Sequence, residues 1–326
     1  MRVGEKQLIA QVRRMAGSRK TPAVQAGIGD DCAVLRLPAH AGKSDEVLVT
    51  TDFTLEGIHF RRDWHSPESV GHRCLARGLS DIAAMGGLPE AAFLSLALPR
   101  DLPQKWVERF TLSLIDLAKR YGVTLAGGDT AESPGGVLAD IVVVGRVPKG
   151  KAVLRSGARP GDLIYVSGGL GGSAAAVVAM QAKPKRKLNP VEYPRHFFPQ
   201  LRIELGHILR EKNLASAMID TSDGLSTDLA HICEESGVGA ELQAAAIPRA
   251  KVGKPPREVD LELALHGGED YELLFTARPN RQIPRRIAGV SITQIGRITH
   301  SRRVTLFNPA GVGHKFDPQG WEHFRK

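Results

Sequence analysis

The sequence predicts an α/β protein with two domains, and three observations support this fold class. Strand-like and helix-like segments alternate through both halves of the chain. A connection rich in Gly, Lys and Arg, KGKAVLRSGARPGD at 149–162, lies near the middle. The length of 326 residues suits about two domains of roughly 150 residues each. We therefore expect an N-terminal domain over 1–149 and a C-terminal domain over 150–326.

Two helices are expected in the first half. The first begins at Ser66-Pro67, a capping residue followed by a proline, and ends before the pair Gly86-Gly87. The second runs from near Pro103 to Gly122, with apolar residues at helical spacing between them. The strands predicted around these helices cover 46–54, 91–99, 123–130 and 140–148.

The second half begins with a predicted strand at 162–167. A Gly-rich turn and an Ala-rich helix over 173–182 follow it. The stretch 183–199 is basic and Pro-rich, starting with KPKRK, and predicts a loop. Further helices are expected near 201–212 and from about Ser226, and further strands at 216–220, 238–246, 271–278 and 291–299.

The composition is typical of a soluble globular protein, with 42% hydrophobic and 24% charged residues. No apolar run approaches the ~18 residues of a membrane helix. The N-terminal MRVGEKQLIA lacks the apolar core of a signal peptide. Cys32, Cys74 and Cys233 are far apart and form no CxxC pair, which favours reduced, buried thiols. We expect a cytoplasmic protein that does not enter a membrane.

The formal net charge of +9 fits two classes of protein. It would suit either a nucleic-acid-binding protein or an enzyme that attracts anionic substrates. Aromatic residues make up 5%, without the interleaving of Lys or Arg and aromatics used by single-strand binders. The simplest interpretation of KPKRK is a solvated loop, so the charge by itself does not choose between the classes.

Two short segments resemble phosphate-binding motifs. GKS at 42–44 lacks the glycine that a P-loop needs at position 37, where Leu37 stands. GGLGGSA at 168–174 contains G-x-G-x-x-A, but the acidic residue expected about 20 positions later would fall in the basic loop. This turn either presents free N–H groups to an anion or is a plain tight turn.

A set of carboxylates lies at the ends of apolar strand-like runs, beside Gly, Ser or Thr. Each one alone is explained by a helix cap or a turn. The pattern recurs in both halves, and few of these segments carry an Arg or Lys beside the carboxylate. Its members are Asp30 and Asp31 in GIGDDCAV, Asp52 in VLVTTD, Asp81 in GLSDIAAMGG, Asp129 in LAGGD, Asp220 and Asp223 in MIDTSDG, and Glu269 and Asp270 in GGEDYELLF.

A cluster of hard cations would explain all of these carboxylates together. Mg²⁺ takes oxygen ligands and usually binds through a few carboxylates plus substrate phosphates. The hydroxyl and carbonyl groups of Thr50, Thr51 and Ser222 fit such a coordination shell. The adjacent Asp30 and Asp31 can then coexist, because metal charge would lie between them and a polyphosphate, and the nearby glycines would let the backbone approach closely.

The segments that carry these residues resemble the thiamine-monophosphate kinase family, within the superfamily of aminoimidazole ribonucleotide synthetase. The similarity is ordered and runs from Gly4 to the C-terminal GWEHF. The clearest departure is the basic stretch 183–199. The motifs that carry the resemblance are GIGDDCAVL, TTDFTLEGIHF, GLSDIAAMGG, AGGDTAESP, LRSGARPGD, IDTSDGLSTDL and GGEDYELLF.

The resemblance implies the reaction ATP + thiamine monophosphate → ADP + thiamine diphosphate. It implies a homodimer in which the N-terminal sheets form a barrel across the two subunits. It also implies that ATP and several Mg²⁺ ions bind between the N-terminal domain and a C-terminal α/β domain that completes the nucleotide and thiamine-phosphate sites.

The resemblance also implies roles for residues at matching motif positions. Asp30 is a secondary metal candidate beside Asp31, and Arg155 would act electrostatically on phosphate. The implied metal ligands are Asp31, Thr50, Thr51, Asp52, Asp81, Asp129, Asp220 and Asp223; the implied nucleotide contacts are Gly128, Asp129, Arg155 and Ser222; the implied thiamine-phosphate contacts are His59, Glu269 and Trp321.

The expected mechanism is direct in-line transfer to a phosphate oxygen. The second pKa of a phosphomonoester is about 6, so the nucleophile is already ionised and no general base or phosphoenzyme is needed. Sister enzymes are the nearest alternative. Cys32 follows the first acidic motif, unlike the reactive residue of selenophosphate synthetase, and the chain lacks the terminal Cys of the hydrogenase-maturation relative. An aminoimidazole ribonucleotide synthetase-like activity and a basic nucleic-acid-binding protein remain alternatives.

Overall fold

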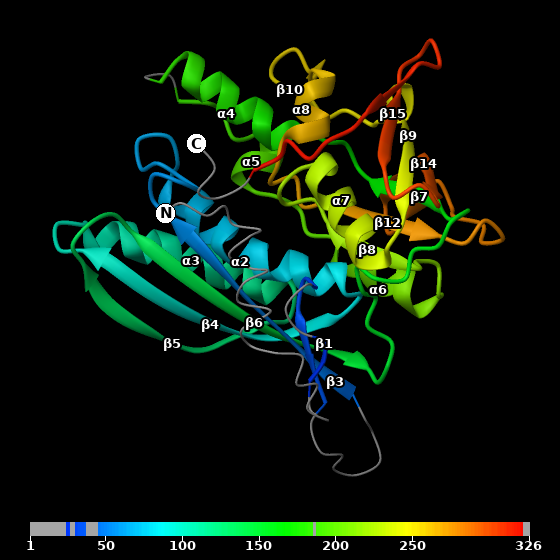
Figure 1. The fold of residues 1–326 in the computed structure, drawn as a ribbon. Coiled ribbons are helices and arrows are strands. Elements are labelled where there is room, and N and C mark those ends of the chain that lie inside the picture. Colours follow the sequence, from blue (N-terminus) through cyan, green and yellow to red (C-terminus); the bar gives the residue numbers. More distant parts are fainter. Residues whose placement is uncertain (1–23, 27–29, 37–44, 185–186, 322–326) are drawn as a thin grey trace.

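Two β-sheets, one from each half of the chain, organise the fold (Figure 1). The computed structural model describes residues 24–26, 30–36, 45–184 and 187–321. The glycines of the GIGDDCAV motif and two residues of the basic loop therefore lie outside the described residues. The two-domain α/β fold class predicted from the sequence is confirmed.

The N-terminal sheet is antiparallel except where β4 and β5 run parallel. Its helices α2 (Pro67–Ala84) and α3 (Gln104–Arg120) lie together on one face (Figure 1). Ser66 caps α2 by accepting a hydrogen bond from the Ser69 amide, as the sequence predicts. The strand order is β1 (Val24–Ala26), β2 (Ala33–Leu35), β3 (Asp45–Leu55), β6 (Leu138–Pro148), β4 (Leu88–Pro99) and β5 (Thr124–Ser133).

The opposite face of this sheet carries no described helix (Figure 1). Phe53 and Phe93 are exposed there, with 52% and 39% of their surfaces accessible. The edge strand β5 is exposed over nearly all of its length. We refer to this surface as the open face of the N-terminal sheet.

The C-terminal sheet pairs distant segments of the second half. Strand β13 (Arg286–Ile287) adds to β14, and a separate hairpin joins β10 (Lys251–Val252) to β11 (Arg257–Glu258). The order of the main strands is β16 (Gly313–Lys315), β15 (Val304–Phe307), β9 (Gly239–Gln243), β14 (Val290–Thr299), β7 (Leu163–Ser167), β12 (Leu273–Ala277) and β8 (Ala217–Asp220).

Each face of the C-terminal sheet packs into a different hydrophobic cluster. Met218 and Phe275 belong to the cluster that includes α2, whereas Ile219 and Leu274 belong to a second cluster that includes α7. This alternation follows from the two-residue period of a strand. The helices of this half are α4 (Gly172–Ala182), α5 (Pro194–Phe197), α6 (Ile203–Glu211), α7 (Leu225–Ser236) and α8 (Leu261–His266).

Helix α2 contacts both domains and is buried along most of its length. It packs on the N-terminal sheet, on α3, and on α6 and β8 of the second half. Gly206 allows α6 to approach α2 closely, because a Cβ there would lie 2.1 Å from the Ala83 carbonyl oxygen. Helix α2 therefore supplies residues to the region between the two domains.

The predicted elements are confirmed, with differences where local signals are weak. The strand predicted over 238–246 ends at Gln243 and continues as a 3₁₀ turn, η1 (Ala244–Ala246), since alanine has little preference for strands. The short α5, inside the predicted loop, was missed, as were α8 and the shortest strands. Burial raises the pKa of Cys74 and of Cys233 to about 12, as expected for inert thiols. Across the part of the chain that the structure covers, every helix is too short or too polar to cross a membrane.

Candidate active site

Three carboxylates from separate elements converge between the domains. Asp31 precedes β2, Asp81 lies in α2, and Asp220 ends β8. Each contributes an oxygen atom, and these atoms lie within 4.8 Å of one another. We call Asp31, Asp81 and Asp220 the acidic triad. The sequence predicted all three as metal ligands, and the fold brings them to one place.

The electrostatics of the acidic triad favour an added cation. Burial and the neighbouring carboxylates raise the pKa of Asp81 well above its usual value. The same two causes raise the pKa of Asp220 to about 7. The hydroxyl groups of Thr50 and Ser80 donate hydrogen bonds to Asp81 and Asp220, at 2.5 and 2.6 Å. Carboxylate and hydroxyl oxygens are the ligands that Mg²⁺ takes, so these residues fit the expected metal.

Arg155 lies against the acidic triad rather than in a solvated linker. Its Nε and Nη2 atoms donate to the two carboxylate oxygens of Asp31, at 3.1 and 2.9 Å. Its backbone amide donates to Asp30 at 2.9 Å. Burial raises the pKa of Asp30 to about 7 despite this hydrogen bond. Arg155 thus supplies the positive charge next to the triad.

A pocket of about 670 Å³ extends from the acidic triad between the domains. Asp81 and Asp220 lie in its wall, together with residues of α4, α8 and the GGEDYELLF segment. Ser173, Val177 and Leu263 contribute part of its less charged side. Further predicted site residues in the lining are Asp52, His59, Ser222, Asp223, Glu269 and Trp321.

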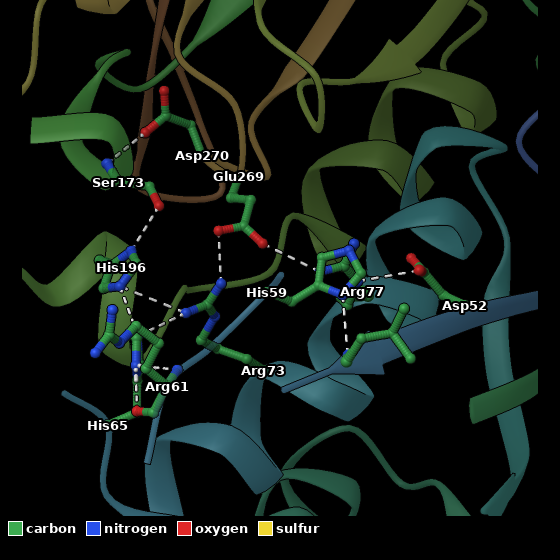
Figure 2. Close-up of polar contacts among 11 residues, drawn as sticks. Asp52, His59, Arg61, His65, Arg73, Arg77, Ser173, His196, Glu269 and Asp270 are labelled. Carbon is green, nitrogen blue, oxygen red and sulfur yellow. Dashed lines mark hydrogen bonds and ion pairs between the residues drawn. The ribbon is translucent and has the colours of Figure 1, made fainter. Parts of the chain in front are cut away.

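Glu269 is held by two arginines of α2, as Figure 2 shows. Arg73 donates to its Oε2 atom at 2.5 Å and Arg77 to its Oε1 atom at 3.1 Å. Burial alone would raise the pKa of Glu269, but the two guanidinium groups hold it down to about 2. Arg77 also donates from Nε to Asp52 at 3.0 Å, so it links a predicted metal ligand to a predicted substrate contact.

The GGEDYELLF segment has an unusual backbone. Glu269 and Tyr271 adopt φ values of 62° and 51°, a conformation that costs roughly 1–3 kcal/mol for residues other than glycine. Their amides donate to the carbonyl groups of Ser222 and Thr221, which holds this conformation. Glu269 consequently faces α2, whereas Asp270 between them faces α4 (Figure 2).

Asp270 settles the interpretation of the Gly-rich turn GGLGGSA. Its carboxylate accepts hydrogen bonds from the amides of Gly171 and Ser173, at 2.5 and 3.1 Å. The N-terminus of α4 therefore already has a carboxyl partner from within the chain. The turn positions Ser173 in the pocket wall.

His59, from the N-terminal half of the chain, and Trp321, from the C-terminal half, both line the pocket. The His59 Nδ1 atom accepts a hydrogen bond from the Leu55 amide at 3.0 Å. The Trp321 amide donates to the Asp223 carbonyl at 3.0 Å, and 52% of the Trp321 surface is exposed. An aromatic face and an anionic Glu269 border the same pocket.

Thr51 and Asp129 lie away from the acidic triad. Asp129 is aligned with Ser95, Asp140 and Phe53 across β5, β4, β6 and β3, which places it on the open face. Thr51 donates to Asp140 at 2.7 Å on that same face. Thr50 and Asp52 alternate with Thr51 and face α2. The predicted metal ligands are thus divided between the two faces of one sheet.

Gly128 has a structural reason to be glycine. Its φ is 152°, and a Cβ there would lie 1.8 Å from the Leu94 carbonyl oxygen. This close contact is within the sheet, between β4 and β5. The role of Gly128 in nucleotide binding stays a prediction.

Arg73 and Arg77, which neutralise acidic residues in the fold, were not predicted from the sequence, whereas Arg155 was. Few basic partners were expected, because few of the motif segments carry an Arg or Lys beside the carboxylate. In the fold, Arg155 meets Asp31, and Arg77 meets Asp52. A signal existed, since Arg73, Arg77 and Asp81 are spaced four residues apart and share one face of the helix predicted after Ser66-Pro67.

Two family models match the chain. The N-terminal domain of AIR synthase related protein matches residues 29–147. The C-terminal domain of AIR synthase related protein matches residues 159–307. These ranges contain most of the strands of the two sheets, with β1 and β16 lying outside them.

Individual relatives match over nearly the full length. Thiamine-monophosphate kinase of Salmonella typhimurium is 38% identical over 336 residues, covering 99% of each chain. The enzyme of the same name from Escherichia coli is 38% identical over 334 residues, with the same coverage. A solved structure of AaThiL complexed with AMPPCP and TMP superposes with a TM-score of 0.84, at 33% identity and 99% coverage of both chains.

Proposed function

The chain belongs to the AIR synthase related proteins and, within them, to the thiamine-monophosphate kinase family, and we propose that it transfers the γ-phosphoryl group of ATP to thiamine monophosphate. The resemblance drawn from the motifs is thereby confirmed. ATP as the phosphoryl donor is supported by the AaThiL complex with AMPPCP, which superposes over 99% of this chain.

The observation that carries this proposal is the acidic triad, two members of which, Asp81 and Asp220, lie in the wall of a pocket between the domains. Asp31, Asp81 and Asp220 supply carboxylate oxygens at one end. Glu269 and Trp321 border the same pocket. This arrangement suits a substrate with a phosphate at one end and a flat, cationic ring at the other.

The acidic triad would hold Mg²⁺, with Thr50 and Asp52 beside it. When bound, Mg²⁺ would offset the negative charge of two phosphorylated substrates. Ser80 and Thr50 orient the carboxylates through their hydroxyl groups. Arg155 adds a fixed positive charge, and it can turn to phosphate once Asp31 has another cation. The metal roles of Asp223 and Asp30 stay proposals of the same kind.

The thiamine moiety would bind at Glu269, Trp321 and His59. Glu269 stays ionised because Arg73 and Arg77 stabilise its carboxylate. An indole face attracts a cationic ring, and thiamine carries one. Ser222, proposed as a nucleotide contact, also lines the pocket, and its carbonyl group accepts a hydrogen bond from the Glu269 amide.

The transfer needs no protein nucleophile. The acceptor is a phosphate oxygen that is already ionised near neutral pH, because its second pKa is about 6. The residues of this chain hold the two substrates in line and exclude water between the domains.

We also propose a homodimer that buries the open face of the N-terminal sheet. The exposed Phe53 and Phe93 and the edge strand β5 support an interface there. A barrel across two such sheets would bring Asp129 and Thr51 of one protomer toward its partner. A domain boundary at residues 149–150 is supported by the family models, which end at 147 and begin at 159.

The direct test is an activity assay. Purified protein is incubated with ATP, Mg²⁺ and thiamine monophosphate, and the products are followed by mass spectrometry. We expect ADP and thiamine diphosphate in equal amounts, and neither with EDTA. If ATP binds but no thiamine diphosphate forms, the chain would be a sister enzyme with another acceptor. Salt-dependent binding to random DNA without ATP binding would favour the nucleic-acid alternative.

A further inference from the structure

Arg77 stands in the pocket between the two ends of the proposed substrate site. Its guanidinium group contacts Asp52 on the side of the acidic triad and Glu269 on the side of the proposed thiamine contacts (Figure 2). The phosphate of thiamine monophosphate must lie between the metal region and the thiamine ring. Arg77 therefore occupies the part of the pocket that this phosphate would enter.

The charge of the pocket makes Arg77 important for an anionic ligand. Among the described residues that line the pocket, Arg77 is the sole Arg or Lys. The carboxylates in that lining are Asp52, Asp81, Asp220, Asp223, Glu262 and Glu269. These carboxylates would repel a phosphate dianion unless a cation contacted the phosphate directly.

The guanidinium group of Arg77 has N–H donors beyond those that bind Asp52 and Glu269. It carries five N–H donors in a planar fork, and its bonds to Asp52 and Glu269 use two of its nitrogen atoms. When a metal takes Asp52 and the cationic thiamine ring approaches Glu269, both carboxylates gain other positive partners. The fork of Arg77 can then pair with phosphate oxygens, which match its geometry.

We propose that Arg77 is a substrate-binding residue that contacts the phosphate of thiamine monophosphate, the group that accepts the γ-phosphoryl of ATP. This inference rests on the proposed function and adds a residue to it. In the free protein the same guanidinium neutralises Asp52 and Glu269, and substrate binding exchanges those partners for the acceptor phosphate.

Arg73 provides a matched control. It also donates to Glu269, at 2.5 Å, but it does not line the pocket and its side chain is 4% exposed. Removing either arginine takes one cation from Glu269. Only the removal of Arg77 would also take away a contact with the phosphate.

The test compares the binding of thiamine monophosphate and of thiamine by calorimetry, with saturating Mg²⁺ and no ATP. We expect Arg77→Met to weaken thiamine monophosphate binding about 10- to 100-fold, the usual effect of losing hydrogen bonds to a charged group. Its binding of thiamine should weaken only as much as in Arg73→Met, because each variant takes one cation from Glu269. Arg73→Met should weaken both ligands to a similar extent, because it acts through Glu269.

Arg77→Lys tests the same point in case Arg77→Met does not fold, with folding monitored by melting temperature. Lys keeps the charge but not the fork, so we expect a smaller loss confined to thiamine monophosphate. Equal weakening of both ligands by the Arg77 variants, or no weakening, would overturn the proposal. Failure of the wild-type protein to make thiamine diphosphate would instead count against the proposed function.

Discussion

The two faces of the N-terminal sheet treat their acidic residues differently. On the face covered by α2, Asp52 pairs with Arg77, and Thr50 donates to Asp81. On the open face, Asp140 accepts from Thr51, and Asp129 lies exposed on the edge strand β5. Consecutive residues of β3 therefore lie on opposite faces of the sheet.

This difference shows what burial does to a carboxylate. Asp81 and Asp220 lie between the domains, and burial together with their neighbours raises the pKa of both. The open face offers its carboxylates to solvent or to a second protomer. A covered site can attract a cation by itself, whereas the open face can contribute to such a site when another subunit approaches.

Asp81→Asn should give the largest effect, because it removes a charge from the covered site. We expect turnover to fall at least about 100-fold, since a metal site supplies several kcal/mol of transition-state stabilisation. The melting temperature should be kept or increased, because asparagine brings no charge into the buried triad. Steady-state kinetics at saturating Mg²⁺ and thermal unfolding measure the two effects.

Asp116→Asn is the control for this experiment. Asp116 is an exposed carboxylate of α3, outside the pocket, and its replacement should leave turnover unchanged. Near-normal turnover of Asp81→Asn would show that the acidic triad is not the metal site.

Mixed dimers test whether the open face acts across subunits. Asp129→Asn and Asp81→Asn should each be inactive alone. If each site takes Asp81 from one protomer and Asp129 from the other, refolding an equimolar mixture should restore about a quarter of the wild-type turnover. A mixture that stays inactive would place both residues in a site built from one chain, whereas an Asp129→Asn variant that is active alone would exclude Asp129 from the site.

The pH dependence of stability should show a smaller effect. The pKa of Asp220 is about 7 in the folded protein and near 3.8 in the unfolded chain, so the folded state binds the proton more tightly. This contribution to stability is present below pH 3.8 and is lost as the pH rises through 7.

In EDTA we therefore expect the melting temperature to fall by about 2–4 °C between pH 5.5 and 7.5. Asp220→Asn should reduce this fall but not abolish it, because burial also raises the pKa values of Asp30 and Asp270 to about 7. Mg²⁺ should oppose the fall by binding the ionised carboxylates. A melting temperature that is constant or rises over this range would contradict the raised pKa values.

The candidate site was predicted from the sequence to differing degrees. Asp31, Asp81 and Asp220 were recognised because carboxylates beside apolar runs need a partner. Arg73 and Arg77 were not predicted, because the acidic partner that they share is distant in the sequence. Their partner Glu269 is almost two hundred residues away along the chain. The homodimer, the barrel, the cytoplasmic location and the individual residue roles stay predictions.

The sequence by itself determined the order of the main strands and helices, the family and the acidic motifs. These follow from local patterns such as the Ser66-Pro67 helix start and the residues quoted in GGEDYELLF. The tertiary structure decided which carboxylates meet and which arginines neutralise them. It also decided that Asp270 caps α4, and that Asp52 and Asp129 lie on opposite faces. The physical reason is that charge interactions depend on distance in space, which the packing of α2 between the domains sets.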